Sequence, residues 1–303
     1  MDLSVIIVNW NRKDLLLNCL SSVFKNISGL SFEVIVVDNG SDDGSPSAVR
    51  EKYPEVILIE NRENLGFAKA NNIAFRIMKG RYALLLNNDC ILKKGSVEAL
   101  YRFMEENPDV GICCGQLLNP DGSKQNSFSS FPNLLFYLTN ESLMKILFPK
   151  RFPSKYIDYR SPIEVDSCIG ACMMIRKEAL DSVGYFDEDY FFFFEETDLA
   201  YRMKKKGWKV FFVPSAQIYH LQGKTVGSGS GARILFYRSR YTFLKKHYPE
   251  RYWIYKAVIF SRVFFNMILN LFGLAFTFGM KESIKEKFIR YKDLFIWHLK
   301  GCP

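Results

Sequence analysis

The sequence predicts an α/β fold built on a mainly parallel sheet, and three observations carry this prediction. Short β-branched runs, such as residues 3–8, alternate with stretches of helical periodicity. The apolar runs are continuous rather than alternating, which is typical of strands buried on both faces of a sheet. Three of the runs end in polar clusters, at residues 9–11, 38–40 and 87–89.

The expected strands and helices follow one another in order through the first 118 residues. Apolar residues recur at helical spacing between residues 16 and 23, directly after the first strand. Later apolar runs are bounded by Gly, Asn and Asp, which favour turns. We expect further strands at residues 32–38, 56–60, 82–86 and 110–115, and helices at residues 67–78 and 95–106.

The pattern is weaker in the middle of the chain. Residues 119–133 are rich in turn formers, and residues 131–164 mix aromatic, basic and proline residues without a clear period. Strand and helix patterns return at residues 165–180 and 184–214. The middle stretch is expected to cover a site or to recognise a second substrate, and the sequence does not decide between these two roles.

Composition limits the class of function. A hydrophobic content of 48%, with 27 phenylalanines, excludes a disordered chain. The net charge of +9 suits a polyanionic partner: nucleic acid, an anionic membrane surface or a phosphorylated substrate. Because there is no paired Cys/His zinc spacing and no basic region followed by heptads, we expect no nucleic-acid partner.

The cysteines and the first residues indicate a cytoplasmic protein. The seven cysteines lie mostly inside apolar runs and form no CxxC pair, which is typical of reduced thiols. The first residues lack the basic segment and long apolar run of a secretory signal.

The three polar clusters predict a shared site. In a parallel sheet, ligands bind outside the carboxyl ends of the strands, and each cluster stands at such an end. Any one cluster could be an ordinary turn. Three clusters in consecutive α/β units favour a common polar site.

Six segments together resemble the family 2 glycosyltransferases of the GT-A fold, particularly bacterial rhamnosyltransferases. They are SVIIVNWN, VIVVDNGSDDGS, NLGFAKANN, LLLNND, the stretch from GACMMIRKEAL to KKKGW, and IYHLQGKTVG, and they span roughly residues 3 to 240. The resemblance implies a Rossmann-like nucleotide-sugar-binding domain, a divalent metal and inversion at the anomeric carbon. Neither a GxGxxG nor a GxxxxGK[ST] loop is present, which argues against dinucleotide binding and phosphoryl transfer.

The resemblance assigns the metal to two residues. Sugar transfer leaves negative charge on a diphosphate, and Mg²⁺ or Mn²⁺, which prefer oxygen ligands, would neutralise it. Asp89 resembles the main metal ligand, with Asn88 as its neighbour. The family usually has an acidic residue two places earlier, where this chain has Asn87, so the metal could bind more weakly or through water. His220 resembles a second ligand, although a histidine bonded to backbone near a loop is the alternative.

Several further residues resemble the donor pocket. Asp38, the first polar residue after four apolar ones, would accept a hydrogen bond from the base or ribose. The alternative, an Asx turn, could be formed equally well by Asp42 or Asp43. Gly66 would allow close approach of backbone to ligand, and Gly170 lies in a small-residue strand between donor and acceptor. Arginines suit phosphate, and a solvated basic face is equally open for them. The remaining candidates are Asn9, Asn64, Asn71 and Asn88 for the nucleotide, and Arg176, Arg238 and Arg240 for phosphate.

The catalytic base is expected in the segment FFFFEETDLAYR. An acceptor hydroxyl must lose its proton as it attacks, and a nearby carboxylate is the usual agent. Glu195 and Glu196 point in different directions on a helix. The family usually has Glu-Asp here with the second acid as base, which selects Glu196, with Glu195 as its neighbour. Asp198 and Arg202 are spaced for an ion pair on a helix surface.

The C-terminal region differs from the rest. Residues 263–280 contain no charged side chain, and this run is close to the length that a helix needs to span a bilayer. A basic amphipathic pattern follows it. We expect peripheral, monotopic attachment to the inner face of the cell membrane. The alternative is a helix packed on the catalytic domain or in a homodimer. The expected domains are 1–245, with halves at about 1–118 and 119–245, and 246–303.

Taken together, the sequence predicts an inverting, metal-dependent glycosyltransferase. The expected reaction moves rhamnose from dTDP-rhamnose to a hydroxyl of a cell-surface glycan or a polyprenyl-diphosphate-linked acceptor. A nucleotidyltransferase usually has a glycine-rich loop with Lys or Arg near its N-terminus. This alternative is disfavoured because residues 8–16 contain no glycine. A catalytically lapsed nucleotide-sugar-binding scaffold is the other alternative, because Asn87 and Glu196 depart from the family pattern.

Overall fold

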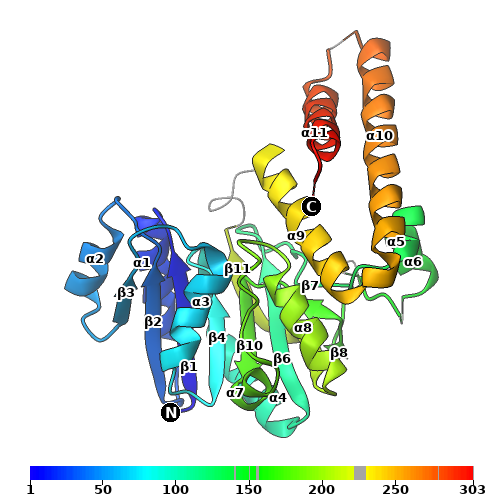
Figure 1. The fold of residues 1–303 in the computed structure, drawn as a ribbon. Coiled ribbons are helices and arrows are strands. Elements are labelled where there is room, and N and C mark those ends of the chain that lie inside the picture. The colour runs from blue at the N-terminus through cyan, green and yellow to red at the C-terminus, as the bar shows by residue number, and fades with distance from the viewer. Residues whose placement is uncertain (140, 150, 155–156, 222–229, 279, 303) are drawn as a thin grey trace. The chain divides into compact units, whose positions relative to one another are not determined.

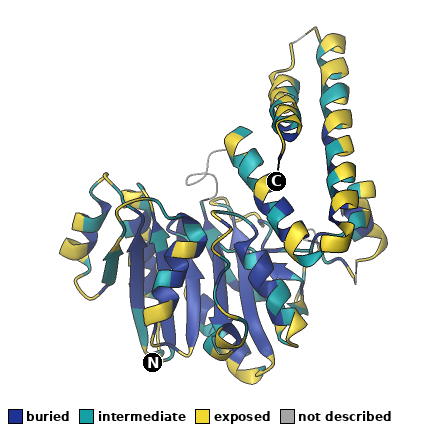
Figure 2. Cartoon of the chain, viewed as in Figure 1, coloured by how far each residue is buried: buried dark blue, intermediate teal, exposed yellow. Residues whose placement is uncertain are grey.

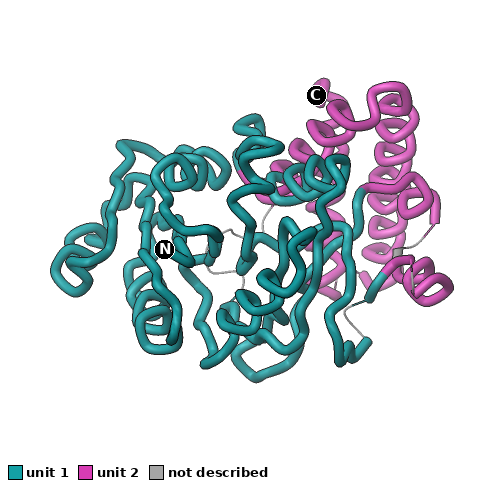
Figure 3. The backbone as a smooth tube through the Cα atoms, turned by 90° about the horizontal axis from the view of Figure 1, so that it is seen from below, with its two compact units in different colours: residues 1–131, 153–191, 195–225 teal, residues 132–152, 192–194, 226–303 magenta. Residues whose placement is uncertain are grey.

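The chain forms two compact units (Figure 3), seen in a computed structural model that describes all residues except 140, 150, 155–156, 222–229, 279 and 303. The first unit comprises residues 1–131, 153–191 and 195–225. The second comprises residues 132–152, 192–194 and 226–303. Each unit is described separately below.

The first unit is built on a nine-stranded sheet with the order β3-β2-β1-β4-β10-β6-β11-β5, and β8 pairs with β11 (Figure 1). The strands of this sheet are β1 (Leu3–Asn9), β2 (Phe32–Asp38), β3 (Ile57–Glu60), β4 (Tyr82–Leu86), β5 (Cys90–Leu92), β6 (Val110–Leu118), β8 (Ile163–Glu164), β10 (Cys172–Arg176) and β11 (Lys209–His220). A separate two-stranded sheet pairs β7 (Phe128–Ser129) with β9 (Ser167–Cys168).

The sheet is mainly parallel, as predicted. The strands β1, β2, β3 and β4 are parallel to one another. The strand β10 lies antiparallel between β4 and β6, and β11 is parallel to β6. Six strands therefore run in one direction, and β5, β8 and β10 run in the other. The carboxyl ends of the parallel strands consequently meet at one edge.

Helices cover both faces of this sheet, and the sequence pattern explains why. Successive strand residues point to opposite faces, so Val5 and Ile7 enter one apolar core while Ile6 enters the other. Helices α1 (Lys13–Asn26) and α4 (Ser96–Glu106) close the first core. The second core is closed by α3 (Gly66–Ile77), α7 (Lys177–Val183) and α8 (Glu195–Lys205), while α2 (Ser45–Lys52) packs against α1. Burial on both faces (Figure 2) accounts for the continuous apolar runs.

The second unit is helical within its described residues. It contains α5 (Leu134–Leu138), α6 (Glu141–Leu147), α9 (Ser230–His247), a 3₁₀ turn η1 (Pro249–Arg251), α10 (Tyr252–Phe276) and α11 (Glu282–Leu299). An aromatic core holds it together, in which the Tyr241 hydroxyl lies 2.8 Å from Nε2 of His298. Among the described residues, one helical stretch, 249–276, is long and apolar enough to cross a membrane, and only 11% of its most apolar part is buried.

Arg176 has a structural role, so the interpretation of it as a phosphate ligand is wrong. Its guanidinium donates to the carbonyl oxygens of Met104 and Asn107 at the end of α4, at 2.6 and 3.1 Å. It also donates to the Val110 carbonyl and the Tyr82 hydroxyl, at 2.9 and 3.0 Å. These partners lie at the amino ends of β4 and β6, opposite the polar clusters.

We predict that Arg176→Met lowers the free energy of unfolding by about 2 kcal/mol, because charged hydrogen bonds to the end of α4 are lost. Urea denaturation followed by circular dichroism measures this change. Nucleotide affinity, measured by calorimetry, should stay at the wild-type value. Unchanged stability together with weakened nucleotide binding would show that the arginine serves a ligand instead.

Candidate functional site

A chain of buried hydrogen bonds joins the carboxyl ends of three parallel strands. Asn88, just after β4, donates through Nδ2 to Oδ1 of Asn9 at 2.7 Å. Asn9, the last residue of β1, donates to Oδ2 of Asp38 at the end of β2, at 2.9 Å. All three side chains are buried. The prediction that the polar clusters come together is therefore confirmed.

Asp38 closes a turn. The amide and the hydroxyl of Ser41 both donate to its carboxylate, at 2.7 Å each. With Asn9 as a further donor, both carboxylate oxygens already accept hydrogen bonds. Asp38 is thus the Asx-turn residue itself, and its contact with a nucleotide stays a prediction.

Asn64 and Gly66 organise the loop before α3. Oδ1 of Asn64 accepts from the Gly66 amide at 3.0 Å, and Asn39 donates to the same oxygen at 3.2 Å. Gly66 has φ of +81°, and a Cβ there would lie 2.5 Å from the carbonyl oxygen of Phe191. Glycine is therefore required at position 66, because only glycine leaves room for the backbone at Phe191. Asn71 donates to the Phe67 carbonyl at 2.8 Å, inside the same helix.

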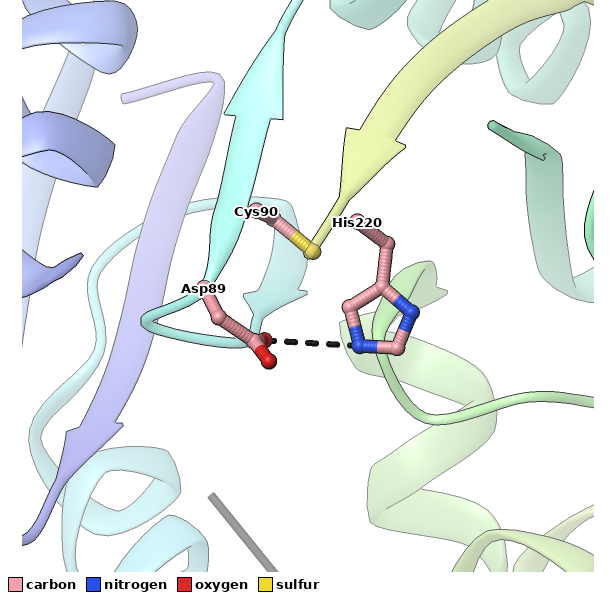
Figure 4. A group of neighbouring side chains, drawn as sticks. All are labelled: Asp89, Cys90 and His220. Carbon is pink, nitrogen blue, oxygen red and sulfur yellow. Dashed lines mark ion pairs between the residues drawn. The ribbon is translucent and has the colours of Figure 1, made fainter. Parts of the chain in front are cut away.

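Asp89 and His220 meet although 131 positions separate them (Figure 4). Nε2 of His220 lies 3.3 Å from Oδ1 of Asp89, and both side chains are nearly buried. The end of β11 brings them together, because His220 pairs with Cys90 of β5 and the Leu221 amide donates to the Asp89 carbonyl at 2.9 Å.

Gln125 fixes the tautomer of His220. Nε2 of Gln125 donates to the carbonyl oxygens of His220 and of the Asn119 side chain, at 2.6 and 2.7 Å. Oε1 of Gln125 must then accept from Nδ1–H of His220, 2.9 Å away. In a neutral ring this leaves a lone pair on Nε2, directed toward the Asp89 carboxylate. Two lone-pair atoms that face each other, the imidazole nitrogen and the carboxylate oxygen, could both coordinate a cation.

Cys90 lies beside this pair, and its chemistry excludes it as a ligand for a hard cation. Its Sγ falls within 4.8 Å of the ligand atoms of Asp89 and His220 (Figure 4). Burial raises the pKa of the Cys90 thiol well above its usual range, so the thiol stays protonated. It donates to the Ala171 carbonyl at 3.3 Å. An oxygen and an imidazole nitrogen remain as the fitting ligands for Mg²⁺ or Mn²⁺.

Glu195 and Glu196 begin α8 next to Gly170. A Cβ at Gly170 would lie 3.9 Å from Cβ of Glu196, with Phe67 at a similar distance. The following residue, Ala171, accepts from the Asn87 amide at 2.8 Å. The segment 170–171 therefore lies between Glu196 and the polar cluster 87–89.

Burial controls the protonation of the two glutamates. Desolvation raises the pKa of Glu196 to about 7, and desolvation together with the neighbouring Glu196 charge raises the pKa of Glu195 well above its usual range. In both side chains Oε2 is buried, and it makes no hydrogen bond within the described part of the chain. A carboxylate with a pKa near neutrality, beside the small residues Gly170 and Ala171, fits a general base. The prediction of a strand at Gly170 is wrong, because residues 170–171 form a turn between β9 and β10.

Asp198 and Arg202 form a buried pair, so the interpretation of them as a surface pair is wrong. Nε of Arg202 lies 2.7 Å from Oδ2 of Asp198, whose side chain is fully buried. The same guanidinium donates to the carbonyls of Val183, Gly184 and Tyr185. The pair thereby holds the loop that leads to α8.

Arg238 and Arg240 lie on α9, within the second unit. The guanidinium of Arg240 lies over the rings of Tyr137, Phe236 and Tyr237, at 5.2, 4.6 and 4.9 Å. These stacked contacts give Arg240 a packing role. The phosphate contacts of both arginines stay predictions.

Sequence reasoning missed Gln125 and Cys90. Gln125 stands in a turn-rich stretch, 95 positions from the histidine that it orients. Cys90 belongs to an apolar strand and carries no motif. No local signal could have identified either residue, because tertiary pairing creates both contacts.

Three comparisons identify the relatives of this chain. Residues 4–184 match the sequence profile of glycosyl transferase family 2. An N-acetylglucosaminyl-diphospho-decaprenol L-rhamnosyltransferase of Mycobacterium tuberculosis is 30% identical over 226 residues, which cover 70% of this chain and 74% of the relative. A hexosyltransferase of low-salt glycan biosynthesis from Haloferax volcanii is 27% identical over 211 residues, covering 68% of this chain and 62% of the relative.

A solved structure confirms the fold. A mannosyltransferase of Pyrobaculum calidifontis, in complex with GDP-Man and Mn²⁺, matches with a TM-score of 0.60 and 16% identity. The match covers 99% of this chain and 86% of that chain. The predicted GT-A fold is therefore confirmed.

We predict that Gln125→Ala weakens Mn²⁺ binding about 10- to 100-fold, because the orienting partner of His220 is lost. Titration of Mn²⁺ followed by electron paramagnetic resonance of the free ion measures the affinity directly. Gln217→Ala is the matched control, since Gln217 lies on β11 with His220 but accepts from Lys93 instead. Equal Mn²⁺ affinity in both variants would show that Gln125 does not prepare His220 as a ligand.

Proposed function

This chain belongs to glycosyl transferase family 2, and we propose that it is an inverting, metal-dependent rhamnosyltransferase. It is a glycosyltransferase that uses a nucleotide-sugar donor. One observation carries the finer proposal: the Asp89–His220 pair and Glu196 belong to the same strand-end edge, with residues 170–171 between the polar cluster and the glutamate. The residues that would bind a cation to neutralise the diphosphate and the residue that would act as base therefore belong to one edge of the sheet.

Asp89 and His220 would hold the cation. A bound Mg²⁺ or Mn²⁺ supplies positive charge that stabilises the departing diphosphate. Asn88 keeps Asp89 next to the strand ends through its bond to Asn9. Because Asn87 is an amide, Asp89 provides the acidic ligand of this cluster, in agreement with a site completed by phosphate oxygens and water.

Glu196 is the proposed base. Its carboxylate accepts the proton of the acceptor hydroxyl while the hydroxyl oxygen bonds to the anomeric carbon. The bond from that carbon to the diphosphate oxygen breaks on the opposite face, and its electron pair leaves with the diphosphate. Attack opposite the leaving group inverts the anomeric configuration. Glu195, protonated by its burial, limits negative charge beside the base.

The proposed substrates are supported by the relatives, and the proposed donor pocket by the sequence resemblance. The name of the mycobacterial relative supports rhamnose as the transferred sugar and a polyprenyl-diphosphate-linked acceptor. The dTDP carrier and the alternative of a cell-surface glycan acceptor are proposed from the sequence resemblance. The proposed donor contacts of the first unit come from the strand ends, the loop before α3 and the turn at Gly170, and the sequence resemblance adds two arginines of the second unit. They are Asn9, Asp38, Asn64, Gly66, Asn71, Asn88, Gly170, Arg238 and Arg240.

We further propose a location at the cytoplasmic face of the cell membrane. The exposed apolar helix α10 and the lipid-linked substrate named for the relative support it. Residues 1–245 would then carry catalysis, and residues 246–303 would carry attachment.

A donor panel tests the proposed reaction. We expect turnover of dTDP-rhamnose with a lipid-linked N-acetylglucosaminyl diphosphate acceptor, lost on chelation with EDTA and restored by Mn²⁺. Chromatography of the product and nuclear magnetic resonance of its anomeric proton measure transfer and configuration. Binding of nucleotide sugars without transfer from any donor in the panel would identify a scaffold instead.

We predict that Glu196→Gln abolishes measurable transfer, and that wild-type kcat/KM rises as the pH increases through about 7, where Glu196 loses its proton. Because ionisation of this carboxyl is disfavoured in the folded state, the variant should be at least as stable as the wild type above pH 7. Thermal melting checks this sign. The exposed Glu178→Gln serves as control and should keep full activity. Wild-type turnover in Glu196→Gln would remove the base assignment.

A further inference from the structure

The helix α10 exposes an apolar stripe. Phe265, Leu269, Phe272 and Phe276 are exposed, with Phe272 at 68% and Phe276 at 89%. Their spacing of four, three and four residues places them on one side of the helix. Isolated exposed apolar residues are ordinary on proteins, whereas a continuous stripe marks an interaction surface.

The charged helix α11 lies along α10. Phe295, near the end of α11, stands 5.5 and 5.6 Å from the rings of Phe260 and Phe264. Near its start, Ile284 would lie 3.3 Å from a Cβ at Gly273. The two helices are therefore antiparallel neighbours over most of their length (Figure 1).

This packing decides how α10 can meet a bilayer. Lys285, Lys287 and Lys292 of α11 are exposed, with Lys287 on the other flank of the helix from Lys285 and Lys292. Charged side chains are costly in the hydrocarbon core, so α11 cannot enter it. Because α10 is packed against α11, it cannot cross the bilayer alone while this contact lasts. A position in the plane of the membrane interface satisfies both helices.

The segment α5–α6 attaches to the same side of α10. Nη1 of Arg262 donates to the carbonyls of Phe136, Tyr137 and Thr139, at 2.8, 3.1 and 3.1 Å, and so caps the end of α5. Arg262 stands three residues before Phe265, which places both on one helix face. The stripe of α10 thus continues toward α5.

The segment α5–α6 exposes apolar side chains of its own. Ile146 is 74% exposed, and the other exposed apolar residues of this segment are Leu135, Leu138, Leu143, Leu147 and Phe148. The core beneath them is small, with Phe136 and Phe152 packed edge to face at 4.8 Å. Six apolar side chains of this segment are exposed, whereas three form the buried core beneath them.

We propose that the stripe of α10 and the exposed apolar side chains of α5–α6 form one surface, the apolar face, which inserts into the interface of an anionic membrane leaflet. This inference rests on the membrane location proposed above. The lysines of α11 then contact lipid phosphates. A second copy is a poorer occupant, since two chains of net charge +9 would repel each other.

Co-sedimentation of the full chain with vesicles of 70% phosphatidylcholine and 30% phosphatidylglycerol tests the apolar face. We expect Phe272→Glu and Ile146→Glu each to lower the vesicle affinity about tenfold or more, because a carboxylate replaces an exposed apolar side chain that inserts into the membrane interface. The matched control is Ile77→Glu, an exposed isoleucine of the first unit, which should bind as the wild type does. Circular dichroism verifies that each variant is folded.

The possible outcomes distinguish a failure of the apolar face from a failure of the proposed membrane location or of the proposed activity. Wild-type affinity in Ile146→Glu, with reduced affinity in Phe272→Glu, overturns the role of α5–α6 and leaves the membrane location intact. No vesicle binding by the wild type overturns the location and this inference together. A dimer in vesicle-free buffer that Ile146→Glu dissociates overturns the lipid as occupant. Rhamnosyl transfer to a water-soluble acceptor analogue measures the proposed activity independently of all three results.

Discussion

The pairing of β11 with β5 is the constraint on which the candidate site depends. The strand β11 runs beside β6, and its last residues then pair with β5, so that His220 stands opposite Cys90 and next to Asp89. A shift of one residue would turn the imidazole to the other face of the sheet. The register shift between Val213 and Gln217 sets this alignment at the end of the strand. The fold thereby brings a carboxylate next to an imidazole nitrogen from far along the chain.

Buried polar groups at this edge restrain one another. Asn9 both accepts from Asn88 and donates to Asp38, so one amide positions two strand ends. Gln125 likewise positions His220, because its side-chain amide bonds both to the imidazole ring and to the backbone carbonyl of His220. Such networks are rigid because each member that loses its partner leaves a buried polar group unsatisfied. Rigid placement matters for a base and a metal site, which act only at short range.

The sequence predicts those features that depend on local pattern. Continuous apolar runs followed by polar residues locate β1, β2 and β4 and their exits, and these exits do meet. Features created by distant pairing escape this reasoning. The guanidinium of Arg176 is chemically suited to phosphate, but it binds the end of α4 at the other edge of the sheet. Spacing gives Asp198 and Arg202 as a pair, yet cannot reveal that the carboxylate is fully buried.

The second unit resists sequence reasoning for a different physical reason. A helix that packs on a sheet buries a regular stripe, and its period can be read from the sequence. The short helices α5 and α6 bury little, and Arg262 together with the edge-to-face contact of Tyr137 and Tyr255 fastens α5 to α10. Several apolar residues there are exposed, so burial in the fold imposes no period on these two short helices. The aromatic and basic excess in the composition thus reflects two different requirements: a sheet core in the first unit, and an outward apolar face beside lysines in the second.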